Sequence, residues 1–272
     1  PWNLSTPVLY YNADLFQARG LKPPTTWAEF ANVSRALTTR ATKGFIAVSD
    51  DWQFEQMVLS RGGRLVTEDG KPNFTSAEVV EALTYLQNLV KAGHAIPRSL
   101  GEQQYAVLDF LRTKAGMAIA SIANWPDILP LSLTFRLGVA PLPRGTRTMV
   151  PFGGAQLVVM SSASDAEKAG AFAFWQFLMR PENIVTWTKA SYYVPPRRSV
   201  LPLLNSWYAE NPFRKTAFEQ LDEAVSRPRV AGYGTWAIYL REAIERAIKD
   251  TNASPRSVLE EAQRRALAQS AR

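Results

Sequence analysis

The sequence predicts an α/β fold, and three observations support this prediction. Short apolar runs typical of buried strands recur along the chain, amphipathic stretches with helix-capping patterns separate them, and 46% of the 272 residues are hydrophobic. Strands separated by helices favour layers with mostly parallel strand pairing. A chain of this length can form one large domain or two lobes of ordinary size.

In the first half of the chain, strand-like and helix-like runs alternate regularly. Thr26–Glu29 and Thr75–Glu78 have the spacing of capping boxes, so each predicts the start of a helix. The helix after Thr75 is amphipathic, and Gly93 is a fitting residue for its end. The predicted strands cover residues 8–11, 44–48 and 116–121, and the other predicted helices cover 26–39, 52–61 and 103–114.

The second half of the chain continues the same alternation. Ser164–Glu167 is a third capping box, and Pro181 suits the first position of the next helix. The apolar run at 155–161 reads as a strand, like the run at 136–141. The helix after this capping box is predicted to extend through residue 178, and further helices are predicted at 212–225, 236–250 and 255–268.

Composition excludes several classes of site and leaves nucleic acid possible as a charged binding partner. The chain has no cysteine, which rules out disulfides, thiolate metal sites and a cysteine nucleophile. No apolar stretch is long enough to span a membrane. The formal net charge of +7 permits nucleic acid as a partner, but the basic residues are scattered rather than clustered. Nucleic-acid binding is therefore kept as an alternative.

Residues that could carry chemistry are sparse. His94 is the only histidine, and no nucleophile elbow, phosphate-binding loop or dinucleotide motif occurs. We therefore expect no catalytic set, no metal and no cofactor. The remaining enzymatic alternative is a carbohydrate-active enzyme with paired carboxylates, for which Glu29, Glu55 and Asp127 are the conceivable residues.

Aromatic residues give a more specific indication. The chain contains 8 Trp, 9 Tyr and 13 Phe, and several stand in predicted loops or at the ends of elements. Aromatic rings stack on the apolar faces of sugars, and open α/β sheets bind ligands beyond the carboxyl ends of their strands. Core packing is the alternative for each ring alone. The rings in question are Trp2, Trp125, Tyr192, Tyr193, Tyr233 and Trp236.

The run Thr6–Phe16, followed by Thr26–Glu29, resembles the signature of the family 1 extracellular solute-binding proteins, the maltose-binding-like group. The lead-in at residues 3–7 looks closest to the glycerol-3-phosphate and glycerophosphodiester-binding branch of this family. Further segments are similar in the same order along the chain: Ala115–Ala118, Phe152–Ala155, 166–183, Tyr193–Pro195 and 254–268.

The resemblance implies a type II periplasmic-binding-protein-like fold, with two α/β lobes joined by a hinge and the ligand between them. It implies that residues 7–137 and 197–272 form the second lobe, that 138–196 form part of the first lobe, and that 1–6 lead into the cleft. Much of the N-terminal lobe of the family pattern is absent from this sequence. We expect the missing N-terminal segment to complete the first lobe and to cover an apolar sheet face that 138–196 would otherwise expose.

The resemblance also implies a set of ligand-binding residues. Gly153 and Gly154 would offer backbone amides, and Tyr193 matches the tyrosine of the family's Gly-Tyr-x-Pro segment, where Tyr192 replaces the usual glycine. The glycerol-3-phosphate branch places an arginine near Gly232 and Tyr233. This chain has Arg229 just upstream, so a neutral sugar or a phosphodiester stays open beside a phosphomonoester. The implied set is Trp2, Ser5, Ser121, Trp125, Gly153, Gly154, Tyr193, Arg229, Tyr233 and Trp236.

In function, the resemblance implies a binding protein rather than an enzyme. It would capture a sugar, glycerol phosphate or glycerophosphodiester by hinge closure and deliver it to the permease subunits of an ABC importer. Its implied location is periplasmic or extracytoplasmic and peripheral to the membrane, with either a lipid anchor or a plain signal peptide upstream. No cofactor and no nucleic-acid partner are implied.

Overall fold

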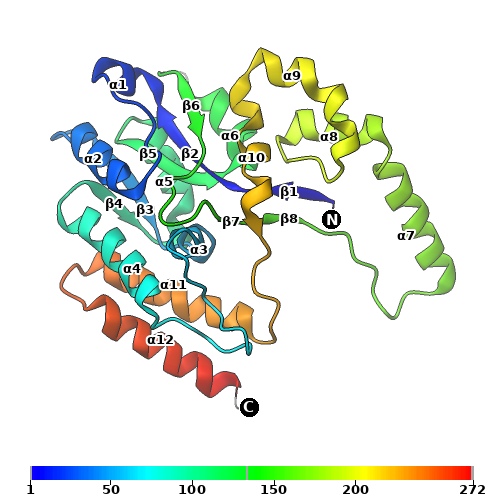
Figure 1. Ribbon diagram of the computed structural model, residues 1–272. Helices are drawn as coiled ribbons and strands as arrows, with labels where there is room; N and C mark the ends of the chain where they lie inside the picture. Colours follow the sequence, from blue (N-terminus) through cyan, green and yellow to red (C-terminus); the bar gives the residue numbers. More distant parts are fainter. Residues whose placement is uncertain (1, 133, 271–272) are drawn as a thin grey trace.

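The computed structural model describes residues 2–132 and 134–270. A five-stranded sheet forms the centre of the larger part of the molecule, with helices on both of its faces (Figure 1). Two short two-stranded sheets lie beside it, and helix α7 lies at the periphery, apart from the sheet. No helix in the described ranges has the length and apolar character needed to cross a membrane.

The strands of the central sheet follow the order β4-β3-β5-β2-β6. β3 pairs in parallel with both β4 and β5, whereas β2 pairs antiparallel with both β5 and β6. The small sheets are β1-β8 and β7-β9. The strands are β1 Asn3–Ser5, β2 Pro7–Asn12, β3 Lys43–Val48, β4 Ala95–Arg98, β5 Ala115–Ser121, β6 Leu137–Ala140, β7 Val150–Pro151, β8 Gly153–Ala155 and β9 Ala224–Val225.

Most helices connect strands or cover the sheet. The α-helices are α1 Ala13–Ala18, α2 Trp27–Leu37, α3 Asp51–Ser60, α4 Ala77–Lys91, α5 Gln103–Leu111, α6 Trp125–Ile128, α7 Asp165–Leu178, α8 Pro181–Ser191, α9 Asn205–Glu210, α10 Thr216–Glu219, α11 Tyr233–Lys249 and α12 Pro255–Ser270. Short 3₁₀ segments occur at Leu100–Glu102, Ile122–Asn124, Leu129–Leu131, Arg198–Leu204, Pro212–Lys215 and Leu221–Glu223.

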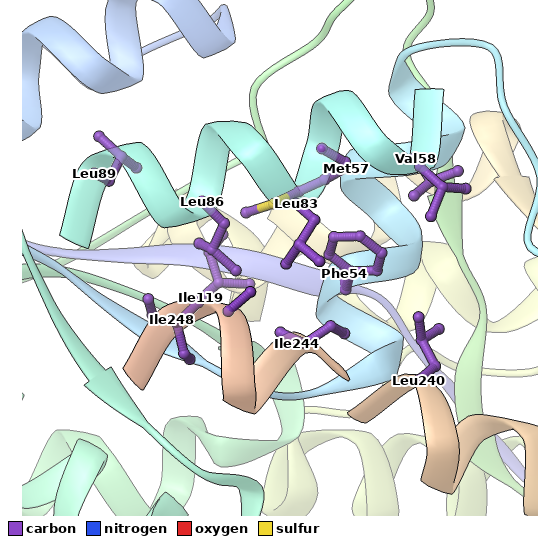
Figure 2. Close-up of a cluster of buried hydrophobic side chains, with 14 of the residues drawn as sticks. Phe54, Met57, Val58, Leu83, Leu86, Leu89, Ile119, Leu240, Ile244 and Ile248 are labelled. Carbon is purple, nitrogen blue, oxygen red and sulfur yellow. The ribbon is translucent and has the colours of Figure 1, made fainter. Parts of the chain in front are cut away.

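The sheet is buried on both faces because alternate side chains of its strands enter different cores. In β2, Leu9 and Tyr11 belong to the core that also contains residues of α2, α3, α4, α11 and α12, whereas Val8 and Tyr10 belong to the core that contains residues of α5 and α6. Figure 2 shows the first of these cores, in which side chains of α4 and α11 point toward each other and Phe54 of α3 lies between them. The labelled residues are Phe54, Met57, Val58, Leu83, Leu86, Leu89, Ile119, Leu240, Ile244 and Ile248.

The structure confirms the alternation of strands and helices but corrects the expected pairing. The sheet is mixed rather than mostly parallel, because β2 runs opposite to both of its neighbours. The predicted helix at 212–225 is broken into two 3₁₀ segments, the single turn α10 and β9. The predicted capping box at Thr75 does not form: Ser76 is the N-cap of α4 and makes no capping hydrogen bond through its side chain.

The strand predicted at 155–161 is also wrong. Only Gly153–Ala155 forms a strand, and the apolar residues Leu157–Met160 that follow are exposed. Helix α7 is capped as predicted, with Ser164 and Glu167 exchanging hydrogen bonds, yet none of its residues is buried. Its exposed face carries Phe172, Phe174, Trp175 and Phe177. The exposed apolar surface therefore lies on a helix, whereas an exposed sheet face was expected beside the missing segment.

Both expected lobe boundaries fall inside packed units. The boundary after residue 137 cuts β6, whose residues pair with Leu9–Asn12 in the central sheet. The boundary after 196 separates Val200, Leu204 and Trp207 from Ile184 of α8, although these side chains share one buried cluster. The lobe assignment stays a prediction, and β6 belongs with the sheet.

Candidate ligand-binding site

The candidate site is a cavity of about 710 Å³ at one edge of the central sheet. Segments that are distant in sequence meet there: the β1-β8 ribbon, the first turn of α3, the end of β5, the second residue after α8 and the segment that joins β9 to α11. Its lining residues are Asn3, Leu4, Ser5, Trp52, Ser121, Phe152, Gly153, Gly154, Ala155, Gln156, Tyr193, Ser226, Arg227, Pro228 and Arg229.

Two glycines allow the β1-β8 ribbon to form part of this lining. Ser5 faces Gly153, and a Cβ atom on Gly153 would lie 2.4 Å from Ser5 Oγ and 2.8 Å from the Trp52 ring. Gly154 has φ +125°, and a Cβ there would lie 2.3 Å from the carbonyl oxygen of Asn3. A side chain at either position would force the ribbon apart.

The sheet places the next residues at the same edge. β3 and β5 are parallel, so their carboxyl ends lie together, and each is followed by a cavity residue. Trp52 stands in the first turn of α3, and its indole Nε1 donates to the carbonyl oxygen of Phe152 at 3.1 Å. Ser121 ends β5 and caps the turn that follows, since its Oγ accepts from the amide of Ala123 at 3.2 Å.

Tyr193 reaches the cavity because the chain turns sharply after α8. Tyr192 adopts φ +60° at the C-cap of α8, which explains why the family pattern has glycine there. Its ring stacks on Trp125, with centroids 5.5 Å apart. The backbone of Val194, the residue after Tyr193, exchanges two hydrogen bonds with Leu4 of β1, and these bonds connect the turn to the ribbon.

A second cavity of about 450 Å³ adjoins the first and shares Ser121 and Tyr193 with it. Trp187 of α8 and Asp127 of α6 line this second cavity. The Trp2 ring packs against Trp187, with centroids 5.2 Å apart. Trp2 therefore lies beside the second cavity but does not line the first.

The two arginines of the cavity have different surroundings. Arg227 forms ion pairs with the buried carboxylates of Asp51 and Glu55 in α3. Arg229 is exposed and donates a hydrogen bond to Ser226 Oγ at 3.4 Å. Burial raises the pKa of Glu55 to about 7, although the charge of Arg227 acts in the opposite direction. Burial and the neighbouring charge of Asp51 also raise the pKa of Asp50.

Six of the ten predicted binding residues come together in the first cavity: Ser5, Ser121, Gly153, Gly154, Tyr193 and Arg229. Three others belong to the hydrophobic core instead. Trp125 is 1% exposed and Trp236 3% exposed, and Tyr233 packs in the same core as Trp236. Their positions at the starts of helices resemble loop positions in the sequence, but the rings point inward.

Sequence reasoning missed Trp52 and Arg227. Trp52 opens the predicted helix that follows the strand predicted at 44–48, so the carboxyl-end rule could have found it. Arg227 gave no such signal, because its partners Asp51 and Glu55 are more than 170 residues away along the chain.

The carboxylates considered for an enzyme lie on different helices and have other roles. Glu29 of α2 accepts hydrogen bonds from Thr25, Glu55 of α3 binds Arg227, and Asp127 belongs to α6. Within residues 2–132 and 134–270, no group of three or more His, Asp or Glu side chains could hold a metal ion.

The family described as bacterial extracellular solute-binding protein matches residues 1–216. The chain belongs to the bacterial extracellular solute-binding protein family. Neither the enzymatic nor the nucleic-acid alternative has support among its relatives.

Two relatives named sn-glycerol-3-phosphate-binding periplasmic protein UgpB are similar over 240 residues. The protein from Pectobacterium atrosepticum is 29% identical, and that from Escherichia coli K12 is 28% identical. Each match covers 81% of this chain, but only 53% and 54% of the relatives. The chain therefore spans about half of their length.

Solved structures show the same fold. UgpB from Mycobacterium tuberculosis in complex with glycerophosphocholine aligns with a TM-score of 0.87 at 23% identity, covering 98% of this chain and 69% of that one. Maltose-bound T. maritima MalE3 aligns with a TM-score of 0.82 at 22% identity, covering 99% and 72%. The fold is therefore that of the two-lobed periplasmic solute-binding proteins.

Proposed function

We propose that the full protein is the substrate-binding component of an ABC importer and captures a sugar or glycerophospho-type ligand by hinge closure. The observation that carries this proposal is the cavity at the sheet edge, where six residues implied by the family pattern meet. The relatives are named as periplasmic binding proteins, which supports a periplasmic or extracytoplasmic location and delivery to a permease.

The lining of the cavity suits a small polar ligand with an apolar face. Trp52 and Tyr193 present aromatic rings of the kind that stack on sugar C–H groups, while Ser5 and Ser121 offer hydroxyls. Arg229 adds a positive charge for a phosphate group. No group in this arrangement needs to make or break a bond, so we propose binding without catalysis.

We further propose that the rest of the full protein completes the first lobe and covers the apolar surface around α7. Phe172, Phe174, Trp175 and Phe177 are exposed on this one helix, and the apolar run Leu157–Met160 is exposed just before it. Folded proteins rarely leave so many large apolar side chains together in water. The covering segment would also supply the opposite wall of the ligand cleft.

A thermal-shift panel on the full-length protein tests the proposed function. The panel contains maltose, sn-glycerol 3-phosphate and glycerophosphocholine, with a short DNA duplex as the non-ligand control. A true ligand at 100 times its Kd adds about 2.7 kcal/mol to the free energy of unfolding. We expect at least one small molecule to raise Tm and the duplex to have no effect. No stabilisation by any small molecule would contradict the proposal.

A further inference from the structure

The segment Ser226–Arg229 lies between two cavities and has few backbone attachments. The 710 Å³ cavity lies on one side, and a cavity of about 350 Å³, lined partly by Glu55 and Val230, lies on the other. Within the described chain, residues 227–229 make no backbone-to-backbone hydrogen bond. The two-residue strand β9 ends just before the segment, and α11 begins after it at Tyr233.

The side chain of Arg227 holds the segment in place through its own contacts. Its guanidinium contacts Asp51, lies 3.3 Å from Glu55 Oε2 through Nε, and donates to the hydroxyl of Tyr233 at 3.4 Å. The guanidinium also lies over the Tyr233 ring, 5.5 Å from its centroid. One arginine therefore connects the segment to both α3 and α11.

The two carboxylates are well placed to hold Arg227. Asp51 and Glu55 are four residues apart on α3, so they share one face of the helix, and their side chains are only 7% and 4% exposed. A buried carboxylate is unfavourable unless it is paired, which makes this contact far more specific than a surface ion pair. Arg241 of α11 supports Asp51 from 3.6 Å.

Arg229 differs from Arg227 in having no such partner. No carboxylate in the described ranges forms an ion pair with it, and Arg229 lines both the larger and the smaller cavity. Pro228 stands between the two arginines and fixes its own φ, so anchoring Arg227 restricts the direction in which Arg229 can project. The contact of Arg227 with α3 therefore limits where the exposed Arg229 side chain can lie at the edge of the larger cavity.

We propose that Asp51 and Glu55 are positioning residues for ligand capture: they clamp Arg227 and, through Pro228, hold Arg229 toward an anionic group of the ligand. This inference rests on the proposed binding function and assigns the phosphate-facing charge to Arg229 rather than Arg227. Arg227 already contacts its two buried partners on α3.

Limited trypsin digestion of the full-length protein tests the clamp without any ligand. Trypsin cleaves after Arg229 but not at the Arg227–Pro228 bond, and cleavage requires the segment to leave its place. We expect Glu55→Gln and Asp51→Asn each to raise the rate of cleavage after Arg229 about tenfold, since each removes one charged hydrogen-bond partner. Glu68→Gln is the matched control, because Glu68 is exposed and lines the smaller cavity. Unchanged cleavage in both clamp variants would overturn the clamp.

Calorimetric titration with sn-glycerol 3-phosphate and glycerophosphocholine tests the consequence for binding. We expect Glu55→Gln to weaken binding about tenfold in the wild-type background and to have no further effect once Arg229→Gln is present. This double-mutant cycle separates positioning of Arg229 from general damage to the fold. Asp51→Asn serves as the second variant if Glu55→Gln folds poorly by circular dichroism.

The outcomes distinguish this inference from the proposed function. If the wild type binds maltose but neither phosphate probe, the function stands and the role of Arg229 is overturned. If Glu55→Gln weakens binding equally with and without Arg229, the residue is structural and the positioning role is overturned. If no panel member binds, the proposed function and this role fall together, while the digestion still decides whether the clamp exists.

Discussion

The helices α4 and α7 both carry large apolar side chains, but only α4 buries them. Leu83 and Leu86 of α4 pack against α11 within the core shown in Figure 2, whereas α7 buries none of its residues. Both helices begin after a serine, and only Ser164, at the start of α7, forms the full capping box. Local capping signals therefore specify where a helix begins, while burial depends on what packs against it.

Matched phenylalanine substitutions in these two regions should differ most in their effect on the free energy of unfolding. Phe54 is 1% exposed in the core and Phe174 is 57% exposed on α7. Phe54→Ala should lower the free energy of unfolding by about 3–5 kcal/mol, because it removes a buried ring and leaves a cavity. In the 272-residue chain, Phe174→Ala should change it by less than about 0.5 kcal/mol. Urea denaturation measures both.

The same two substitutions should differ less in the full-length protein. There the loss from Phe174→Ala should rise above about 1 kcal/mol, because the covering segment would bury the ring. A loss that stays near zero in the full-length protein would mean that α7 is exposed there too.

The next effect concerns the buried charges below the cavity. Arg227→Met leaves Glu55 without its arginine and Asp51 with Arg241 alone, so the free energy of unfolding should fall by about 2 kcal/mol. Arg229→Met is the matched control and should leave stability nearly unchanged, because that side chain is exposed. Chemical denaturation at pH 7.5 compares them, and equal losses would contradict the assignment of separate roles.

A smaller effect is expected in the pH dependence of stability. Burial raises the pKa of Glu55 from its ordinary value to about 7, with Asp51 adding to the shift and Arg227 opposing it. Between the ordinary pKa and 7 the folded protein then holds a proton that the unfolded chain has lost, so stability falls as pH rises through this window. From pH 5 to 8, the wild type should lose on the order of 1 kcal/mol more than Glu55→Gln. Parallel pH profiles would contradict the raised pKa.

Much of the fold could be predicted from local sequence, and the misses have physical causes. The strand at residues 8–11 was predictable because its apolar run is buried on both faces of the sheet. The run at 155–161 has the same apolar character, yet residues after Ala155 form no strand, because a strand needs neighbours to complete its hydrogen bonds. The direction of β2 could not be read from its residues at all.

The candidate site was predictable where a motif fixes the backbone. Gly153 and Gly154 are required by the close approach of β1, and the turn at Tyr192 directs Tyr193 to the cavity. Aromatic residues at helix starts were harder to assign: Trp52 lines the cavity and Trp125 lies in the core. Whether each tryptophan lines the cavity or enters the core depends on the packing at the sheet edge, which the sequence around it does not show.

The central claim is that the cavity at the sheet edge captures a small solute, and calorimetric titration of the full-length protein tests it directly. Titration with maltose, sn-glycerol 3-phosphate and glycerophosphocholine should reveal saturable one-to-one binding for at least one of them. Tyr193→Ala should weaken that binding about tenfold, since it removes a ring from the cavity lining. Tyr105→Ala, at an exposed tyrosine of α5, should leave it unchanged. Equal effects of the two substitutions, or no saturable binding of any probe, would contradict the claim.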